Sequence, residues 1–298
     1  MRFPFRKLHG LGNDFIVVDC RADAELAHSL SQPQLARILC DRRRGIGGDG
    51  ILPILPAPPD SGAYATMVVV NSDGSQAEMC GNGIRCVAKY LGDEDPSLQD
   101  ETALEIHTAA GTLNCELTRE TGLVTQVKVQ MGAPKMEREL IPMTGAGWFI
   151  EQPLEANGRP FSFTAVGMGN PHLIAFVGDG ENLRNLACTY GPAFENHPAM
   201  PNRTNVEFAA VRDKGDIDVW VWERGSGLTQ ACGTGACATL VAAVLTDRAQ
   251  FNTPTPVHLP GGPLTIEVLP EYGAVWMTGP ACDVFSGEWN GHQSVVAR

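Results

Sequence analysis

The chain has 298 residues, about twice the length of an ordinary domain, so two domains are expected. Its apolar fraction of 43% and charged fraction of 19% exclude a disordered chain, a coiled coil and a collagen-like protein. The net charge of −12 argues against a nucleic-acid partner, because an acidic surface repels phosphates.

The expected elements are mostly short alternating strands with a few helices between them. In chain order they are a helix at about 32–40, a strand at 67–70, a helix at 83–91, strands at 127–131 and 216–222, a helix at 235–245 and a strand at 264–269. The longest apolar runs, 67–70 and 240–245, are far shorter than the about 20 residues that cross a bilayer, so no membrane partner is expected. The pattern indicates an α+β protein.

Three motifs occur twice, in the same order in both halves of the chain. They are Gly10-Leu-Gly-Asn with Gly167-Met-Gly-Asn, Cys80-Gly-Asn-Gly with Cys232-Gly-Thr-Gly, and His107-Thr-Ala-Ala-Gly-Thr-Leu with His258-Leu-Pro-Gly-Gly-Pro-Leu. Three pairs in register predict two pseudo-symmetric domains, each a mostly antiparallel sheet wrapped around a central helix. We expect residues 1–134, joined by a C-terminal strand 284–298, to carry Cys80, and residues 135–283 to carry Cys232.

The nine cysteines are an odd number, and the N-terminal residues do not form a secretory signal, so reduced thiols and a cytoplasmic location are expected. The spacings from Cys80 to Cys86 and from Cys232 to Cys237 do not fit a zinc site, and no metal site is predicted. A dinucleotide-binding loop at 233–238 is also disfavoured, since no acidic residue follows at about 20 positions.

Cys80 and Cys232 each lie in a glycine loop directly before a predicted helix. Free N–H groups at a helix start attract a carboxylate and lower the pKa of a nearby thiol. A single reactive cysteine would indicate a nucleophile. Two equivalent cysteines indicate instead an acid and a base that invert a stereocentre, one removing a proton and the other supplying one.

Seven motifs together resemble the diaminopimelate epimerase family. They are Gly10-Leu-Gly-Asn-Asp-Phe, Asn71-Ser-Asp-Gly-Ser, Met79-Cys-Gly-Asn-Gly-Ile-Arg-Cys, Gly169-Asn-Pro-His, Thr204-Asn-Val-Glu-Phe, Glu223-Arg-Gly and Ala231-Cys-Gly-Thr-Gly-Ala-Cys. The resemblance implies an isomerase that interconverts LL- and meso-diaminopimelate for lysine and peptidoglycan synthesis. It also implies that the enzyme needs no cofactor and forms a homodimer in the cytoplasm.

The resemblance also implies a role for each matching residue. Cys80 and Cys232 would be the acid/base pair, and His172 and Glu223 would tune their pKa values. The remaining matching positions would bind substrate: Asn13, Asn71, Gly81, Asn82, Asn170, Asn205, Glu223, Arg224, Gly233 and Thr234. Among these, Arg224 suits the distal carboxylate, because a guanidinium pairs with it bidentately.

The chain departs from the family's sequence pattern at two places, and two alternative functions stay open. Some relatives carry larger residues at Gly48 or Gly50, so a side-chain contact with substrate is absent there, and Phe285 replaces a tyrosine found in the family's dimer contact. One alternative is a proline or hydroxyproline racemase of the same fold, which typically has histidine in place of Asn82 and no use for Arg224. The other is a non-catalytic, redox-sensing ligand-binding protein that uses the cysteines as a switch.

Overall fold

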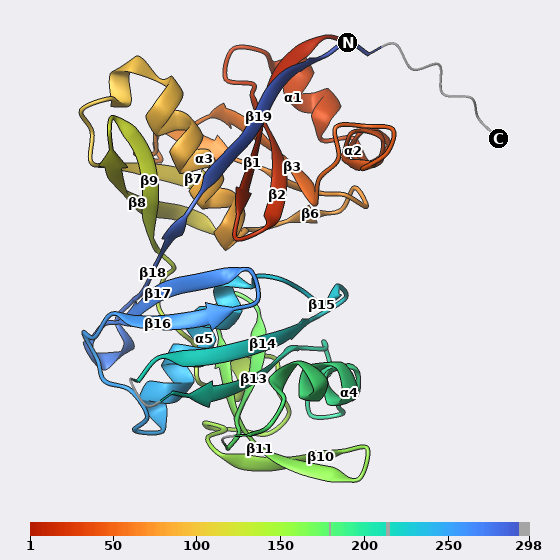
Figure 1. The fold of residues 1–298 in the computed structure, drawn as a ribbon, viewed down its shortest axis with the longest axis vertical. Coiled ribbons are helices and arrows are strands. Elements are labelled where there is room, and N and C mark those ends of the chain that lie inside the picture. The colour runs from red at the N-terminus through yellow and green to blue at the C-terminus, as the bar shows by residue number, and fades with distance from the viewer. Residues whose placement is uncertain (179, 213–214, 292–298) are drawn as a thin grey trace, which may run out of the picture. The chain divides into compact units, whose positions relative to one another are not determined.

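The computed structural model describes residues 1–178, 180–212 and 215–291, and the chain divides into two compact units (Figure 1). The first unit comprises Met1–Val127 together with the described residues from Pro280 onward, and the second comprises Lys128–Gly279. Residues 292–298 of the expected strand 284–298 lie outside the described residues. Each unit contains both helices and strands, so the predicted α+β class is confirmed.

The first unit is built from a chain of paired strands. In order of pairing they are β19 (Cys282–Trp289), β1 (Phe3–Gly10), β2 (Asn13–Asp19), β3 (Gly50–Pro56), the short pair β4 (Ala65–Met67) and β5 (Val69–Asn71), then β7 (Ala103–Thr108) and β8 (Gly111–Glu120). The β2–β3 and β4–β7 pairs are parallel and the others are antiparallel. β6 (Gln76–Ala77) pairs with β5, and β9 (Leu123–Gln130) follows β8.

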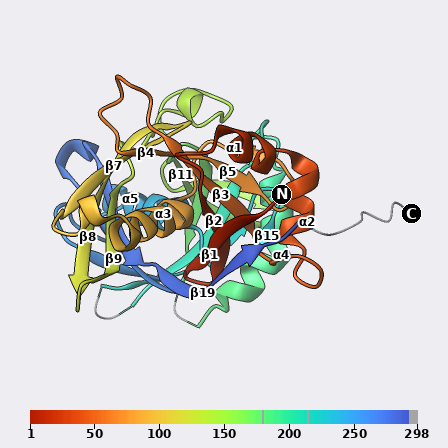
Figure 2. The ribbon, with the colours of Figure 1, turned by 90° about the horizontal axis from the view of Figure 1, so that it is seen from above.

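Helix α3 (Gly81–Glu94) is the buried centre of the first unit. It packs against β1, β2, β3, β7 and β8, and Figure 2 shows it with β1 and β2 on one side and β8 on the other. Eleven of its 14 residues are buried, including the charged Arg85 and Lys89. Helices α1 (Ala24–Leu30) and α2 (Pro33–Cys40) also pack against β3. A 3₁₀ turn at Pro96–Leu98 follows α3.

The second unit repeats this style of pairing. In order of pairing its strands are β10 (Gln152–Ala156), β11 (Arg159–Gly167), β12 (Pro171–Phe176), β13 (Asn205–Val211), β14 (Ile217–Glu223), β16 (Thr255–Leu259), β17 (Gly262–Val268) and β18 (Val275–Pro280). The β12–β13 and β14–β16 pairs are parallel and the others are antiparallel. β15 (Gly227–Leu228) pairs with β14, and 3₁₀ turns lie at Arg138–Leu140 and Pro270–Tyr272.

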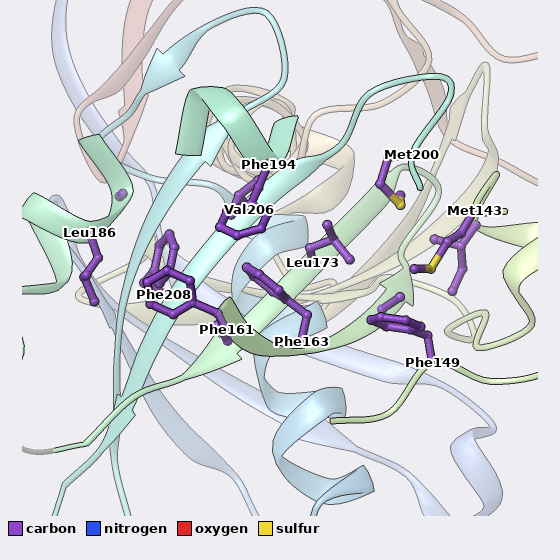
Figure 3. Close-up of a cluster of buried hydrophobic side chains, with 14 residues drawn as sticks. Met143, Phe149, Phe161, Phe163, Leu173, Leu186, Phe194, Met200, Val206 and Phe208 are labelled. Atoms are coloured by element: carbon purple, nitrogen blue, oxygen red, sulfur yellow. The ribbon is translucent and has the colours of Figure 1, made fainter. Parts of the chain in front are cut away.

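Two helices cover opposite faces of β13 in the second unit. Helix α5 (Gly233–Leu245) is buried at every position except Thr234 and Leu245 and packs against β11 to β14, β16 and β17. Helix α4 (Leu183–Glu195) lies on the other face, where Val206 and Phe208 join an aromatic cluster with Phe194 (Figure 3). Because strand side chains alternate, Asn205 and Glu207 point towards α5 instead.

The predicted helices at 32–40, 83–91 and 235–245 correspond to α2, α3 and α5, whereas α1 and α4 were not predicted. Helix α4 contains Gly191 and Pro192, which normally indicate a break. The glycine is required by packing, since a Cβ there would lie 2.6 Å from Trp222 Cβ.

The strand predicted at 67–70 is divided into β4 and β5 at Val68. Val68 N donates to the Pro53 carbonyl at 3.1 Å, but Pro53 has no N–H with which to complete the ladder.

No helix in the described part of the chain is long and apolar enough to cross a membrane.

Candidate active site

Cys80 and Cys232 occupy the same local position in their units. Each is the N-cap residue of a buried helix, with an extended backbone at φ −140° and −117°. The Cys80 sulfur accepts from Gly83 N at 3.4 Å, and the Cys232 sulfur accepts from Gly235 N at 3.4 Å. In each loop the sulfur therefore lies at the positive end of a helix, where N–H groups stabilise a thiolate.

Two asparagine side chains, hydrogen-bonded to each other, lie beside the Cys80 sulfur. Asn13 Oδ1 accepts from Asn82 Nδ2 at 3.1 Å and lies 3.9 Å from Cys80 Sγ, which donates to it. Arg85 then fixes Asn82, since its Nη2 donates to Asn82 Oδ1 at 2.9 Å and its Nη1 to Gly81 O at 3.0 Å. The guanidinium approaches β1 closely, and a Cβ at Gly10 would lie 2.8 Å from Arg85 Nη2. These contacts place Asn13 and Asn82 beside the Cys80 loop.

A charged cluster holds Asn13 from the other side. Asp49 Oδ2 accepts from Asn13 Nδ2 at 2.8 Å, and Arg42 bridges Asp49 and Asp14 at 2.7 and 2.6 Å. Burial would raise the pKa of Asp14, but hydrogen bonds from Arg42 and Lys7 outweigh it and hold that pKa well below its ordinary value. Asp14 thus stays ionised at neutral pH, and its ion pair with Arg42 supports the cluster that orients the Asn13 amide.

Asn71 lies at the end of β5, paired with Gly50 of β3. Its Nδ2 donates to Ser75 Oγ at 3.0 Å within a tight turn. Gly50 is packed too closely for a larger residue, since a Cβ there would lie 2.8 Å from Val70 O. The packing of this unit therefore favours glycine at position 50.

The Cys232 sulfur lies in more acidic surroundings than the sequence indicates. It is 3.5 Å from Thr234 Oγ1, and Glu223 and Glu207 are both close enough to act on it. Burial raises the pKa of the Cys232 thiol, the charges of Glu223 and Glu207 raise it further, and hydrogen bonds from Thr234 and Gly235 oppose them. The expectation of a lowered pKa is wrong for Cys232, since burial and two carboxylates outweigh the helix terminus.

Both predicted tuning residues lie near Cys232 in the second unit. Glu223 is at the end of β14, accepts from Thr229 Oγ1, and has its own pKa raised by burial. His172 is fully buried on β12, with Nε2 2.8 Å from Asn170 Oδ1 and Nδ1 2.6 Å from Glu207 Oε1. Asn170 Nδ2 in turn donates to Thr234 Oγ1 at 3.3 Å. The contacts thus link His172 to Cys232 through Asn170 and Thr234.

Asn205 positions the turn that presents Arg224. Its Oδ1 accepts from Arg224 N at 2.8 Å and its Nδ2 donates to Pro171 O at 3.0 Å. The Arg224 side chain is exposed and donates to Asn202 O at 3.2 Å. An exposed guanidinium held at its backbone can reach a ligand carboxylate with little rearrangement.

Arg85 and Glu207 were not predicted as site residues, although both lie inside motifs that carried the resemblance. Arg85 lies in the motif at 79–86, and Glu207 is two residues after Asn205 on the same face of β13. That spacing is the signal that could have identified Glu207. Within the described residues, no group of three or more His, Cys, Asp or Glu side chains could hold a metal ion.

Several solved structures share the fold of this chain. A probable proline racemase from Agrobacterium radiobacter K84 has a TM-score of 0.72 and 16% identity, covering 98% of this chain and 94% of that chain. A hydroxyproline epimerase from Agrobacterium vitis has a TM-score of 0.71 and 17% identity, covering 97% and 91%. At such identity the likeness establishes the shared fold alone.

Sequence relatives define the family more closely. The family model for diaminopimelate epimerase matches residues 5–137 and 164–284. A diaminopimelate epimerase from Synechococcus sp. (strain JA-3-3Ab) is 49% identical over 290 residues, covering 96% of this chain and 98% of the relative. One from Moorella thermoacetica is 46% identical over 286 residues, covering 96% and 98%. The chain belongs to the diaminopimelate epimerase family, an isomerase family, as its motifs predicted.

Proposed function

We propose that this protein interconverts LL- and meso-diaminopimelate without a cofactor, as a step towards lysine and peptidoglycan precursors. The observation that carries the proposal is the shared geometry of Cys80 and Cys232, each capping a buried helix with a backbone N–H directed at its sulfur. The identity of the substrate is inferred from the relatives named diaminopimelate epimerase, since they match nearly the whole chain.

In the proposed mechanism the two thiols act on one α-carbon and exchange roles with the direction of reaction. The thiolate takes the α-proton, so that an S–H bond forms as the Cα–H bond breaks and the electron pair moves into the carboxylate. The other thiol then donates its proton to the opposite face of the carbon. The raised pKa of Cys232 favours its protonated thiol, the form that donates a proton.

The surrounding residues would hold the substrate. N–H groups at the two helix starts would bind the reacting carboxylate and stabilise the charge that develops on it, at Gly81, Asn82, Gly233 and Thr234. Arg224 would bind the distal carboxylate. The four asparagines would bind the ammonium and carboxylate groups: Asn13, Asn71, Asn170 and Asn205. Glu223 and His172 would adjust the acidity of Cys232.

The finer architecture belongs to the same proposal. Two pseudo-symmetric domains, 1–134 with 284–298 and 135–283, are supported by the pairing order of the strands. The series β1-β2-β3-β4-β7-β8 and β11-β12-β13-β14-β16-β17 have the same sequence of parallel and antiparallel pairs. A cytoplasmic homodimer is also proposed, and the exposed Val284 and Phe285 of β19 are candidates for its contact.

The assay is direct. The purified protein is mixed with LL-diaminopimelate, and the isomers are separated by chiral chromatography over time. The proposal expects the meso isomer to accumulate to equilibrium, and expects L-proline and hydroxyproline to stay unchanged under the same conditions. Racemisation of proline without conversion of diaminopimelate would favour the racemase alternative, and no conversion of any of them would favour a binding protein.

A further inference from the structure

A buried ionisable pair lies beneath the first turn of α5. His172 and Glu207 are both fully buried, and His172 Nδ1 is 2.6 Å from Glu207 Oε1. The same carboxyl group reaches the Cys232 loop, since a Cβ built on Gly235 would lie 2.9 Å from Glu207 Oε1 and 3.2 Å from Cys232 Sγ. The pair is therefore adjacent to the thiol without being its direct hydrogen-bond partner.

An unbroken series of contacts leads from this pair to the sulfur. His172 Nε2 lies 2.8 Å from Asn170 Oδ1, Asn170 Nδ2 donates to Thr234 Oγ1 at 3.3 Å, and Thr234 Oγ1 lies 3.5 Å from Cys232 Sγ. All five residues belong to the second unit. The chain of contacts begins at Glu207 on β13 and ends at Cys232 at the start of α5.

The chemistry of the groups fixes the direction of each hydrogen bond. Asn170 Oδ1 can only accept, so His172 must carry its proton on Nε2. The Thr234 oxygen already accepts from Asn170 Nδ2, which leaves its own O–H hydrogen to donate to Cys232 Sγ. If His172 instead carried its only proton on Nδ1, the Asn170 amide would turn over, and the Thr234 hydroxyl would donate to Asn170.

Glu207 decides between these two arrangements. With Nε2 protonated, His172 Nδ1 needs either a donor or a carboxylate that shares a second proton with it. Glu207 supplies this as long as the pair retains one shared proton. Its Oε2 is buried and has no hydrogen-bond partner in the part of the chain that the structure describes, which disfavours an ionised carboxylate beside a neutral imidazole. Burial also raises the pKa of Glu207.

We infer that Glu207 is a positioning residue that, through His172 and Asn170, directs the Thr234 hydroxyl at the Cys232 sulfur. The ionisable groups that act on this sulfur are Glu223 on β14 and Glu207 on β13, and Glu207 is paired with His172 on β12. Hydrogen bonds from the Thr234 hydroxyl and the Gly235 N–H lower the pKa of Cys232, whereas burial and the two carboxylates raise it. The consequence for turnover rests on the proposed function, whereas the effect on the thiol does not.

The test measures the thiol itself. The rate at which iodoacetamide alkylates Cys232 is followed against pH by peptide mass spectrometry, with Cys80 in the same digest as reference. Glu207→Leu and Glu207→Gln both remove the carboxylate whose charge raises the pKa of Cys232, so the two variants are compared with each other. Glu207→Leu also removes the partner of His172 Nδ1, and the loss of a donor to the thiolate should place the pKa of Cys232 about one pH unit above that in Glu207→Gln, with about tenfold slower alkylation below the midpoint. Glu207→Gln keeps a donor for Nδ1 and should retain the Thr234 hydrogen bond to the sulfur.

Two further comparisons make the result decisive. Thr234→Val removes the final hydroxyl and should raise the pKa of Cys232 by about one pH unit relative to wild type, even if Glu207→Leu fails to fold, whereas Thr234→Ser should not. Glu267→Gln makes the same chemical change on β17, where the side chain pairs with Lys128, and should change nothing. An unshifted Cys232 in Thr234→Val overturns the inference, as does an equal pKa of Cys232 in Glu207→Leu and Glu207→Gln.

Turnover separates this inference from the proposed function. Glu207→Leu should lower kcat more than it changes KM, and Glu207→Gln should restore most of the loss. If wild-type protein does not epimerise diaminopimelate but Cys232 shifts as expected, the proposed function fails and the positioning role stands.

Discussion

Replacing Arg85 by Met should loosen the Cys80 loop and destabilise the first unit. The fully buried guanidinium donates to Asn82 Oδ1 at 2.9 Å, Gly81 O at 3.0 Å and Pro280 O at 3.2 Å. Methionine fills much of the volume but leaves three acceptors to find other donors, each at a cost of about 1–3 kcal/mol. Removal of a buried charge offsets part of this. We expect a loss of about 3 kcal/mol and faster amide exchange in α3.

Urea unfolding measures the free energy, and hydrogen–deuterium exchange of peptides from 81–94 locates the loss. Arg37→Met is the matched control, because this exposed arginine on α2 makes one hydrogen bond to Asp73 O and should change stability by less than about 0.5 kcal/mol. The reasoning is refuted if Arg85→Met unfolds within about 1 kcal/mol of wild type, since an unsatisfied group alone should cost more.

Two further substitutions test the first unit. Gly50→Ala places a methyl group 2.8 Å from Val70 O, so it should destabilise by about 2 kcal/mol in urea unfolding, and wild-type stability would show that the strands yield freely. Asp95→Asn tests acid stability: the Tyr64 hydroxyl, Ser97 and Arg21 outweigh burial and hold the pKa of Asp95 well below its ordinary value. Because the folded pKa is depressed, this stabilisation is present above about pH 4 and lost below it. The variant should thus be less stable than wild type at neutral pH and close to it in acid. A gap that is unchanged in acid would contradict this.

The elements that position the two cysteines could be predicted from sequence, because a Cys-Gly-x-Gly loop before an apolar stretch is a local signal. Helix α4 could not, since Gly191-Pro192 indicates a break and the helix is stabilised by packing against Trp222. Such packing brings together residues about 30 positions apart, and propensity does not report it.

The charge environment of the site was harder to predict than its residues. Arg85 in an amphipathic stretch indicates a solvated side chain, yet it is fully buried and binds three oxygens. The helix start predicts a lowered pKa for Cys232, but burial raises this pKa, and the charges of Glu223 on β14 and Glu207 on β13 raise it further. A local motif can predict a helix terminus, whereas the net electrostatic effect depends on strands remote in sequence.

The two-thiol mechanism is tested most directly by isotope exchange from one pure isomer in heavy water, sampled early and read by mass spectrometry of the separated isomers. Each thiol exchanges its proton with solvent between turnovers, so the donor carries deuterium while the abstracted proton stays on the other sulfur. The account predicts deuterium at the inverted carbon of the product and almost none in unreacted substrate, with turnover lost in Cys80→Ala and Cys232→Ala. Early label in equal amounts in substrate and product, or either variant retaining near-normal turnover, would contradict it.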